Sequence, residues 1–120
     1  MVRTRFPHHR LDVYRLSLEL FREVEQFAAS MPAGHAELKD QVRRAIGSVV
    51  RNIAEGASRH HAKDKATRFQ IARAECAEAA AAIEMAGMIG LVATQDCEEM
   101  IRRADRVAAM LTGLIRRQLA

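Results

Sequence analysis

The sequence predicts an all-α protein folded as an antiparallel up-down-up-down four-helix bundle. Apolar residues recur at steps of three and four over four long stretches, which is the period of a helix with one buried face. Only two prolines occur in 120 residues, so these stretches lack helix breakers. Hydrophobic residues make up 49% of the chain but aromatic residues only 4%, which favours closely packed helices over a β-sandwich. The length indicates one bundle domain, residues 11–120, after a basic N-terminal arm, residues 1–10.

The first helix is predicted to begin at Leu11 or Asp12, after an irregular stretch over residues 1–9, and to end near Ser30. Its core face consists of Val13, Leu16, Leu20, Val24, Phe27 and Met31. A second apolar line comprises Tyr14, Leu18 and Phe21. A helix with two such lines has more apolar surface than one neighbour covers, so we expect Tyr14 and Phe21 to contact another subunit.

The second helix is predicted over Ala36 to Glu55, after a break marked by Pro32 and Gly34. Its core face consists of Leu38, Val42, Ala45, Ile46, Val49 and Ile53. Gly56 is the candidate for a left-handed residue that ends this helix, because glycine has no Cβ.

A stripe of polar residues lies beside this core face, at helical spacing: Gln41, Arg44, Ser48, Asn52 and Glu55. Serine and asparagine form helices poorly, so small polar groups here favour a packed contact with another helix or subunit over a solvated surface. We expect Ser48 and Asn52 to hydrogen-bond across a close helix contact, and Glu55 to pair with Arg59 or cap backbone amides. A ligand-binding role for the stripe is the alternative.

The third helix is predicted over about Lys63 to Ile89, with a dense run of alanines that lets a neighbour approach closely. Its core face consists of Phe69, Ala72, Cys76, Ala79, Ala80, Ile83 and Ala86, with Met88 as a further candidate. The fourth is predicted to start near Thr94 as N-cap, with acids in its first turn and arginines at its end, as the helix dipole favours. Its core face consists of Ile101, Ala104, Val107, Ala108, Leu111, Leu114 and Ile115. Short connectors between four such helices predict antiparallel neighbours.

The formal charge of +4 is modest, but basic residues cluster along the chain, which is compatible with binding an anionic polymer. The candidate nucleic-acid contacts are Arg44, Arg51, Arg59, Lys63, Lys65 and Arg68, with Arg3, Arg5 and Arg10 as helpers. Few aromatic residues are present to stack bases, so contacts should be mainly electrostatic and weakly selective for sequence. The alternative is that these clusters are ordinary solvated faces.

No residue pattern predicts a catalytic, cofactor or metal site, so we expect a protein that is not an enzyme. The pairs His8–His9 and His60–His61 are adjacent residues, which point about 100° apart on a helix and do not chelate one ion together. Glu75, Glu78 and Glu84 lack the following histidine that di-metal bundles use. We expect Cys76 and Cys97 to be reduced thiols that pack as small apolar residues. With no apolar run long enough for a membrane span and no secretory signal, we expect a soluble cytoplasmic protein.

Two segments carry a resemblance to a known family: "LKDQVRRAIGSVVRNIAEGASR", residues 38–59, and "RFQIARAECAEA", residues 68–79. They resemble the small bacterial four-helix-bundle proteins of the 23S ribosomal RNA intervening-sequence protein family. The most specific part is the run from Asn52 to Gly56. This chain departs from the family pattern at Ala74 and Glu75, where Gly-Ser is common.

The resemblance implies an antiparallel bundle that assembles as a ring-shaped homopentamer, and an association with RNA. The first hypothesis is therefore a self-assembling module that binds RNA or another nucleic acid through its basic patches. The second is a protein-interaction scaffold that binds a protein partner and no nucleic acid.

Overall fold

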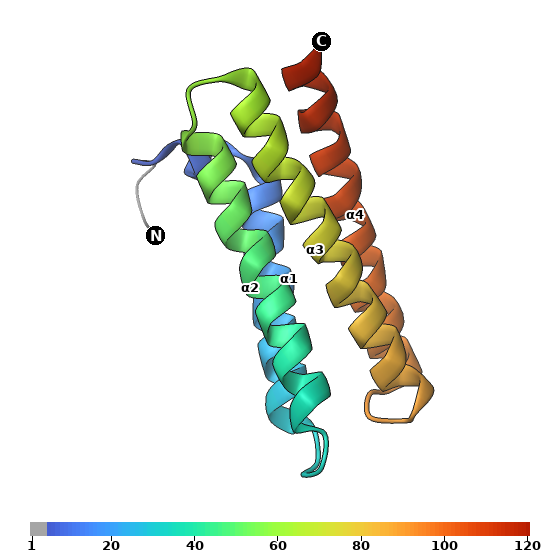
Figure 1. Cartoon of the computed structure of the whole chain (residues 1–120). Helices are drawn as coiled ribbons and strands as arrows, with labels where there is room; N and C mark the ends of the chain where they lie inside the picture. Colours follow the sequence, from blue (N-terminus) through green and yellow to red (C-terminus); the bar gives the residue numbers. More distant parts are fainter. Residues whose placement is uncertain (1–4) are drawn as a thin grey trace.

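Four long helices lie side by side in the computed structural model, which describes residues 5–120 (Figure 1). They are α1 (Asp12–Ser30), α2 (Ala36–Ser58), α3 (Ala62–Met88) and α4 (Thr94–Leu119). Each packs antiparallel against the next, and α1 also packs against α4, which closes the bundle. The predicted all-α, up-down-up-down architecture is confirmed. Residues 1–4 of the predicted arm, Arg3 among them, lie outside the described residues.

The core forms along the axis of the bundle, where every helix contributes branched apolar side chains. Leu20, Ile46, Ile53, Ile83 and Leu111 have no exposed surface. These residues lie on the predicted 3–4 stripes, so burying the stripes pulls the four helices together. Full burial of each such side chain contributes about 1.5–3 kcal/mol, which makes this core the main source of stability.

The helix boundaries follow the predictions closely except at the end of α2. That helix continues three residues past Glu55, through Gly56, and ends at Ser58. Among the described residues, positive φ angles occur only at Gly34 (+100°) and Gly90 (+79°), in the two connections at the opposite end of the bundle. The predicted left-handed role of Gly56 is therefore wrong. Thr94 is also the first helical residue of α4 rather than its N-cap, which is Ala93.

Gly56 lies instead at a tight contact between α2 and α3. A Cβ atom at this position would lie 2.7 Å from Cε1 and 2.9 Å from Cδ1 of the Phe69 ring. Phe69 is 2% exposed and belongs to the core. Glycine is required because the ring occupies the space that any larger side chain would fill.

The N-terminal segment is more ordered than an irregular arm. Residues Pro7–Arg10 form a short 3₁₀ helix, η1, that packs against α2 and α1. Pro7 opens it, as the fixed φ of proline favours in a first turn. The expectation of irregular backbone is therefore wrong for these residues. The short helix η1 lies at the end of the bundle where α2 ends and α3 begins (Figure 1).

Two ion pairs join α1 to its neighbours. Arg43 Nε of α2 donates to Glu25 at 2.9 Å, and Arg103 of α4 donates to Glu23 at 2.6 Å. None of the helices within residues 5–120 combines the length and the apolar character that crossing a bilayer needs.

Candidate nucleic-acid interface

The six candidate basic residues all come from α2, the α2–α3 connection and the first turns of α3. Five of them lie at or near the end of the bundle where α2 ends and α3 begins (Figure 1). Arg44 does not, because fifteen residues of helix separate it from Arg59, a rise of about 22 Å. The structure therefore brings together Arg51, Arg59, Lys63, Lys65 and Arg68, and leaves Arg44 apart.

Three of the six side chains are already engaged within the chain. Arg44 pairs with Asp40 at 2.7 Å, and Arg59 pairs with Glu55 at 2.5 Å. The second pair confirms one of the two predicted roles of Glu55. The Lys65 ammonium donates to the carbonyl of Ala57 at 2.9 Å and to that of Gly56 at 3.4 Å.

Lys65 thus caps the C-terminus of α2, where carbonyl groups lack helical partners and the dipole favours a cation. Sequence reasoning missed this role, since it assigned Lys65 only to nucleic-acid contact. The cationic group that holds two carbonyls is less available to a phosphate than an unengaged one.

Arg51, Lys63 and Arg68 make no ion pair or side-chain hydrogen bond with any described residue. Arg51 and Lys63 are exposed, and Arg68 is half-buried. The Arg51 guanidinium folds back over Gly47 of its own helix, where the missing side chain leaves it room. These three cations are the members of the predicted set that remain available to an anion.

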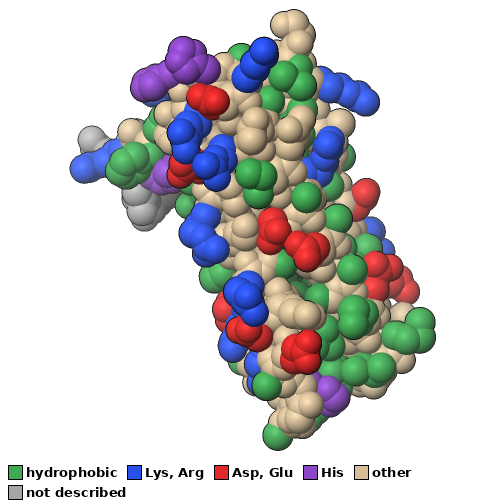
Figure 2. Space-filling model, viewed as in Figure 1, with side chains coloured by type: hydrophobic (Ala, Val, Ile, Leu, Met, Phe, Trp, Pro, Cys, Tyr) green, Lys and Arg blue, Asp and Glu red, His purple; other side chains and the backbone are tan. Residues whose placement is uncertain are grey.

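Other elements add basic side chains to the same end. His60 and His61 lie in the α2–α3 connection, and Arg116 and Arg117 close α4, whose last turn lies beside the first turn of α3. Figure 2 shows Lys and Arg side chains gathered with histidines on the upper left of the molecule, while Asp and Glu are more frequent over the middle and lower parts. We call this end the basic end. It comprises η1, α2 from Arg51 onward, residues 59–61, α3 as far as Arg68, and the last turn of α4.

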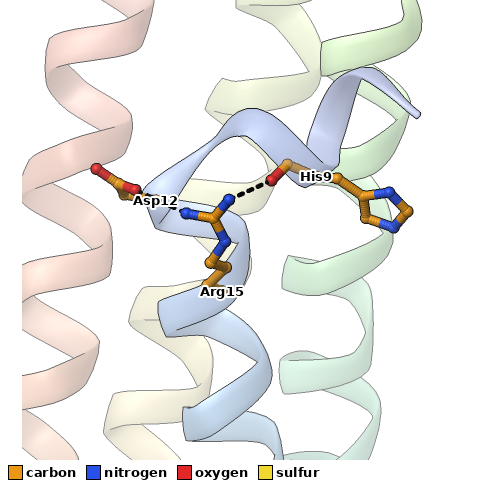
Figure 3. Close-up of polar contacts among 3 residues, drawn as sticks. All are labelled: His9, Asp12 and Arg15. Atoms are coloured by element: carbon orange, nitrogen blue, oxygen red, sulfur yellow. Dashed lines mark hydrogen bonds and ion pairs between the residues drawn. The ribbon is translucent and has the colours of Figure 1, made fainter. Parts of the chain in front are cut away.

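A small polar network holds η1 at the basic end. Arg15 of α1 donates to the backbone carbonyl of His9 at 2.8 Å and to Asp12 at 3.1 Å (Figure 3). His9 Nδ1 in turn accepts the backbone N–H groups of Arg5 and Phe6, each at 3.3 Å.

Four rings meet in this segment. His8 lies between Phe6, nearly parallel to it at 13° and 5.7 Å between centroids, and Tyr14, edge-on at 4.5 Å. His9 also contacts Phe6 and Tyr14. Burial, followed by the charge of His9, lowers the pKa of His8. Sequence reasoning missed this cluster because only the 3₁₀ turn brings His8 and His9 against Tyr14 of α1.

The small polar stripe of α2 lies at the edge of the α2–α3 contact. Ser48 and Asn52 are half-buried, and the Asn52 amide donates to the backbone carbonyl of Ser48 at 2.9 Å and to its hydroxyl at 3.1 Å. The Asn52 bonds therefore remain within α2, and the expectation that they cross to another helix is wrong. Across the contact, the Ser48 hydroxyl lies near enough to Glu75 of α3 to lower the pKa of that carboxyl group.

Glu75 and Glu78 form an acidic pair on α3, close to that hydroxyl. Burial and the neighbouring Glu78 raise the pKa of Glu75, while the nearby Ser48 hydroxyl opposes the rise. Nothing in this arrangement resembles a nucleophile with its base. The stripe has hydrogen-bonding partners inside the chain, as a structural role requires.

Tyr14 and Phe21 are half-buried and pack against the core, while Leu18 between them is 41% exposed. Another line of exposed residues lies on α3, where seven positions at spacings of three and four carry five apolar side chains, a threonine and a glutamate. They are Thr67, Ile71, Ala74, Glu78, Ala81, Met85 and Met88. We call them the outer α3 stripe. A pocket of about 530 Å³ adjoins its end, between Leu38 of α2 and Met88.

The described residues contain no group of three histidine, cysteine, aspartate or glutamate side chains arranged to hold a metal ion. Both cysteines are unpaired. Burial raises the pKa of Cys76 to about 11, and its thiol donates to the carbonyl of Ala104 at 3.2 Å. Such a thiol is protonated and inert at neutral pH.

Known proteins share this architecture. Residues 9–113 match the model of the family described as 23S rRNA-intervening sequence protein. No curated protein matches the chain. A solved structure from Bacteroides thetaiotaomicron, described as a protein of unknown function from the S23 ribosomal protein family, superposes with a TM-score of 0.80 at 19% identity, over 86% of this chain and 97% of that one. The fold is therefore shared, and the family match over nearly the whole chain shows that the protein belongs to the 23S rRNA-intervening sequence protein family.

Proposed function

We propose that this protein binds RNA without catalysing a reaction, through the basic end of a self-assembled homo-oligomer. The observation that carries the proposal is the set of unengaged cations, Arg51, Lys63 and Arg68, at the end where Arg116 and Arg117 also lie. Phosphate contacts by such side chains release counterions, which gives affinity without requiring a particular base sequence. The family's description as an rRNA-intervening sequence protein makes RNA the first ligand to test.

A salt titration tests the phosphate contacts directly. For a labelled single-stranded RNA, the logarithm of the binding constant should fall linearly with the logarithm of salt concentration. Changing Arg51, Lys63 and Arg68 together to Gln should reduce that slope by about 2 per protomer, because each phosphate that is no longer neutralised removes about 0.7 from it. Binding that persists unchanged from low to high salt would contradict a phosphate-driven interaction.

A matched control removes the same charge elsewhere. Arg22 of α1, Lys39 of α2 and Arg102 of α4 lie outside the basic end, and none pairs with a described carboxylate. Changing these three to Gln lowers the net charge equally. The proposal expects the control to retain most of the slope, whereas equal reductions in both triple variants would indicate attraction by net charge alone.

The proposed assembly is supported by the outer α3 stripe. Ile71 is 37% exposed, Met85 57% and Met88 87%, at positions that a partner helix would cover. Helices that are apolar on more than one face are usually buried on more than one face. A ring formed through this surface would repeat the basic end around an axis, so that weak phosphate contacts add up. The ring-shaped homopentamer that the resemblance implies is the assembly we expect.

Light scattering after size exclusion measures the assembly at micromolar concentration. Changing Ile71 and Met85 to Lys should release protomers that keep their helical circular dichroism. Leu18→Lys on α1 is the comparison, because Leu18 lies between Tyr14 and Phe21 on the alternative contact surface. Dissociation by the α1 variant alone would place the subunit contact there, and a wild-type monomer would contradict assembly.

A scaffold that binds a protein partner is the second candidate. The observation that favours it is the same apolar surface together with the adjoining pocket of about 530 Å³. The RNA titration separates the two functions, because a scaffold would assemble normally and bind no RNA even at low salt.

A further inference from the structure

The aromatic cluster on η1 is an exposed feature that the phosphate contacts described above leave unused. Phe6 is 59% exposed, and η1 has no buried residue. Its ring lies nearly parallel to that of His8, which in turn contacts Tyr14. A lone exposed phenylalanine is ordinary, but a ring held in a contiguous group of four offers a flat, defined surface.

The backbone around Phe6 is held in place before any ligand arrives. Arg15 binds the His9 carbonyl, and His9 Nδ1 accepts the N–H groups of Arg5 and Phe6 (Figure 3). The backbone N–H of His9 also donates to the Phe6 carbonyl at 3.1 Å. A segment tied at four hydrogen bonds loses little further conformational freedom when a ligand stacks on it.

Cations flank this aromatic segment along the chain. Arg5 precedes Phe6 in the chain, Arg10 ends η1, and both side chains are exposed without an ion-pair partner among the described residues. An aromatic face flanked by unengaged arginines matches a nucleotide, which joins a flat base to a phosphate on either side.

We propose that the Phe6 and His8 rings form a stacking platform for one unpaired base of single-stranded RNA, with Arg5 and Arg10 on the adjacent phosphates. The proposal rests on the RNA binding proposed above and adds the class of RNA. In a duplex both faces of an internal base are covered by its neighbours, so only an unpaired or splayed base can stack on Phe6. The proposal adds stacking at one point to the mainly electrostatic contact that the sequence predicts.

Phe6→Ala tests the platform by fluorescence anisotropy with two probes, a 12-nucleotide single-stranded RNA and a 12-base-pair RNA duplex. We expect about tenfold weaker binding of the single strand, unchanged binding of the duplex and an unchanged salt slope, because no cation is removed. Phe6→Tyr should restore the affinity. Leu18→Ala, which removes another exposed apolar side chain, is the matched control.

Phe6→Trp adds a direct readout, because the chain contains no tryptophan. Stacking predicts that the single strand quenches the emission of this residue while the duplex leaves it unchanged. The platform is overturned if Phe6→Ala binds the single strand as tightly as wild type, or if RNA binds Phe6→Trp without changing its emission. Failure of the proposed function has a different signature: wild type binds neither probe at low salt, which overturns both proposals.

Discussion

Gly56→Ala tests a tight contact between α2 and α3. The added Cβ would lie 2.7 Å from Phe69 Cε1, 2.9 Å from Cδ1 and 3.2 Å from Arg68 Cβ. Comfortable carbon contacts are about 3.5–4.0 Å, so the ring must retreat by about 1 Å or the helices must separate. Phe69 is enclosed by the core and has no open space to enter.

The expected change in the free energy of unfolding on Gly56→Ala is the sum of two opposing effects. Overpacking of this kind costs about 1–3 kcal/mol, and contact with a buried ring and a β-carbon on the facing helix argues for the upper part of that range. Alanine in place of glycine within a helix returns about 1 kcal/mol. The net expectation is a loss of about 1–2 kcal/mol, which lowers Tm by about 3–8 °C for a chain of this size.

Gly113→Ala is the matched control, since it makes the same chemical change in the interior of α4, where no atom lies within 4 Å of the new Cβ. It should stabilise the protein by up to about 1 kcal/mol. Urea unfolding followed by circular dichroism at 222 nm measures both variants at one protein concentration. In a Phe69→Ala background, Gly56→Ala should no longer be destabilising, because the clashing ring is gone.

The reasoning is refuted if Gly56→Ala and Gly113→Ala stabilise the protein equally. It is also refuted if the cost of Gly56→Ala is the same with and without the Phe69 ring. Either result would mean that the α2–α3 contact is not limited by this ring.

Three further predictions concern single side chains. Lys65→Met should destabilise the fold by about 0.5–1.5 kcal/mol, because the last carbonyls of α2 lose a charged donor. The exposed control Lys63→Met should change the free energy of unfolding by less than about 0.5 kcal/mol. Equal effects of the two variants would show that Lys65 does not stabilise the end of α2. Because the pKa of Cys76 is about 11, about one thiol in a thousand is ionised at pH 8. Ellman's reagent should therefore react with Cys76 only after unfolding. Rapid labelling of Cys76 in the native protein would contradict its burial. The raised pKa of Glu75 means that its stabilising contribution is fully present below the ordinary value of 4.5 and is lost as pH rises through the raised value. Glu75→Gln should therefore unfold at higher urea than wild type at pH 7 and at equal urea at pH 3.5, and a pH-independent difference would count against repulsion from Glu78.

The sequence by itself determined the helices and their buried faces. Periodicity and breakers predicted the start of α1, the start of α2 and the four core stripes, because helix formation depends on neighbours three and four residues away. The Glu55–Arg59 pair was also accessible, since its members lie one turn apart along the chain.

The tertiary structure alone decided which partner each of the other residues meets. A glycine near a helix end can terminate the helix or admit a close neighbour, and only the position of Phe69 on another helix shows that Gly56 does the second. Lys65 became a cap because the α2–α3 connection folds it back onto carbonyls eight and nine residues earlier. His8 and His9 contact Tyr14 because η1 turns toward α1 and is held there by Arg15. Local preferences arise within one turn of chain, whereas the partners in these contacts lie more than one turn apart and meet only when separate segments pack.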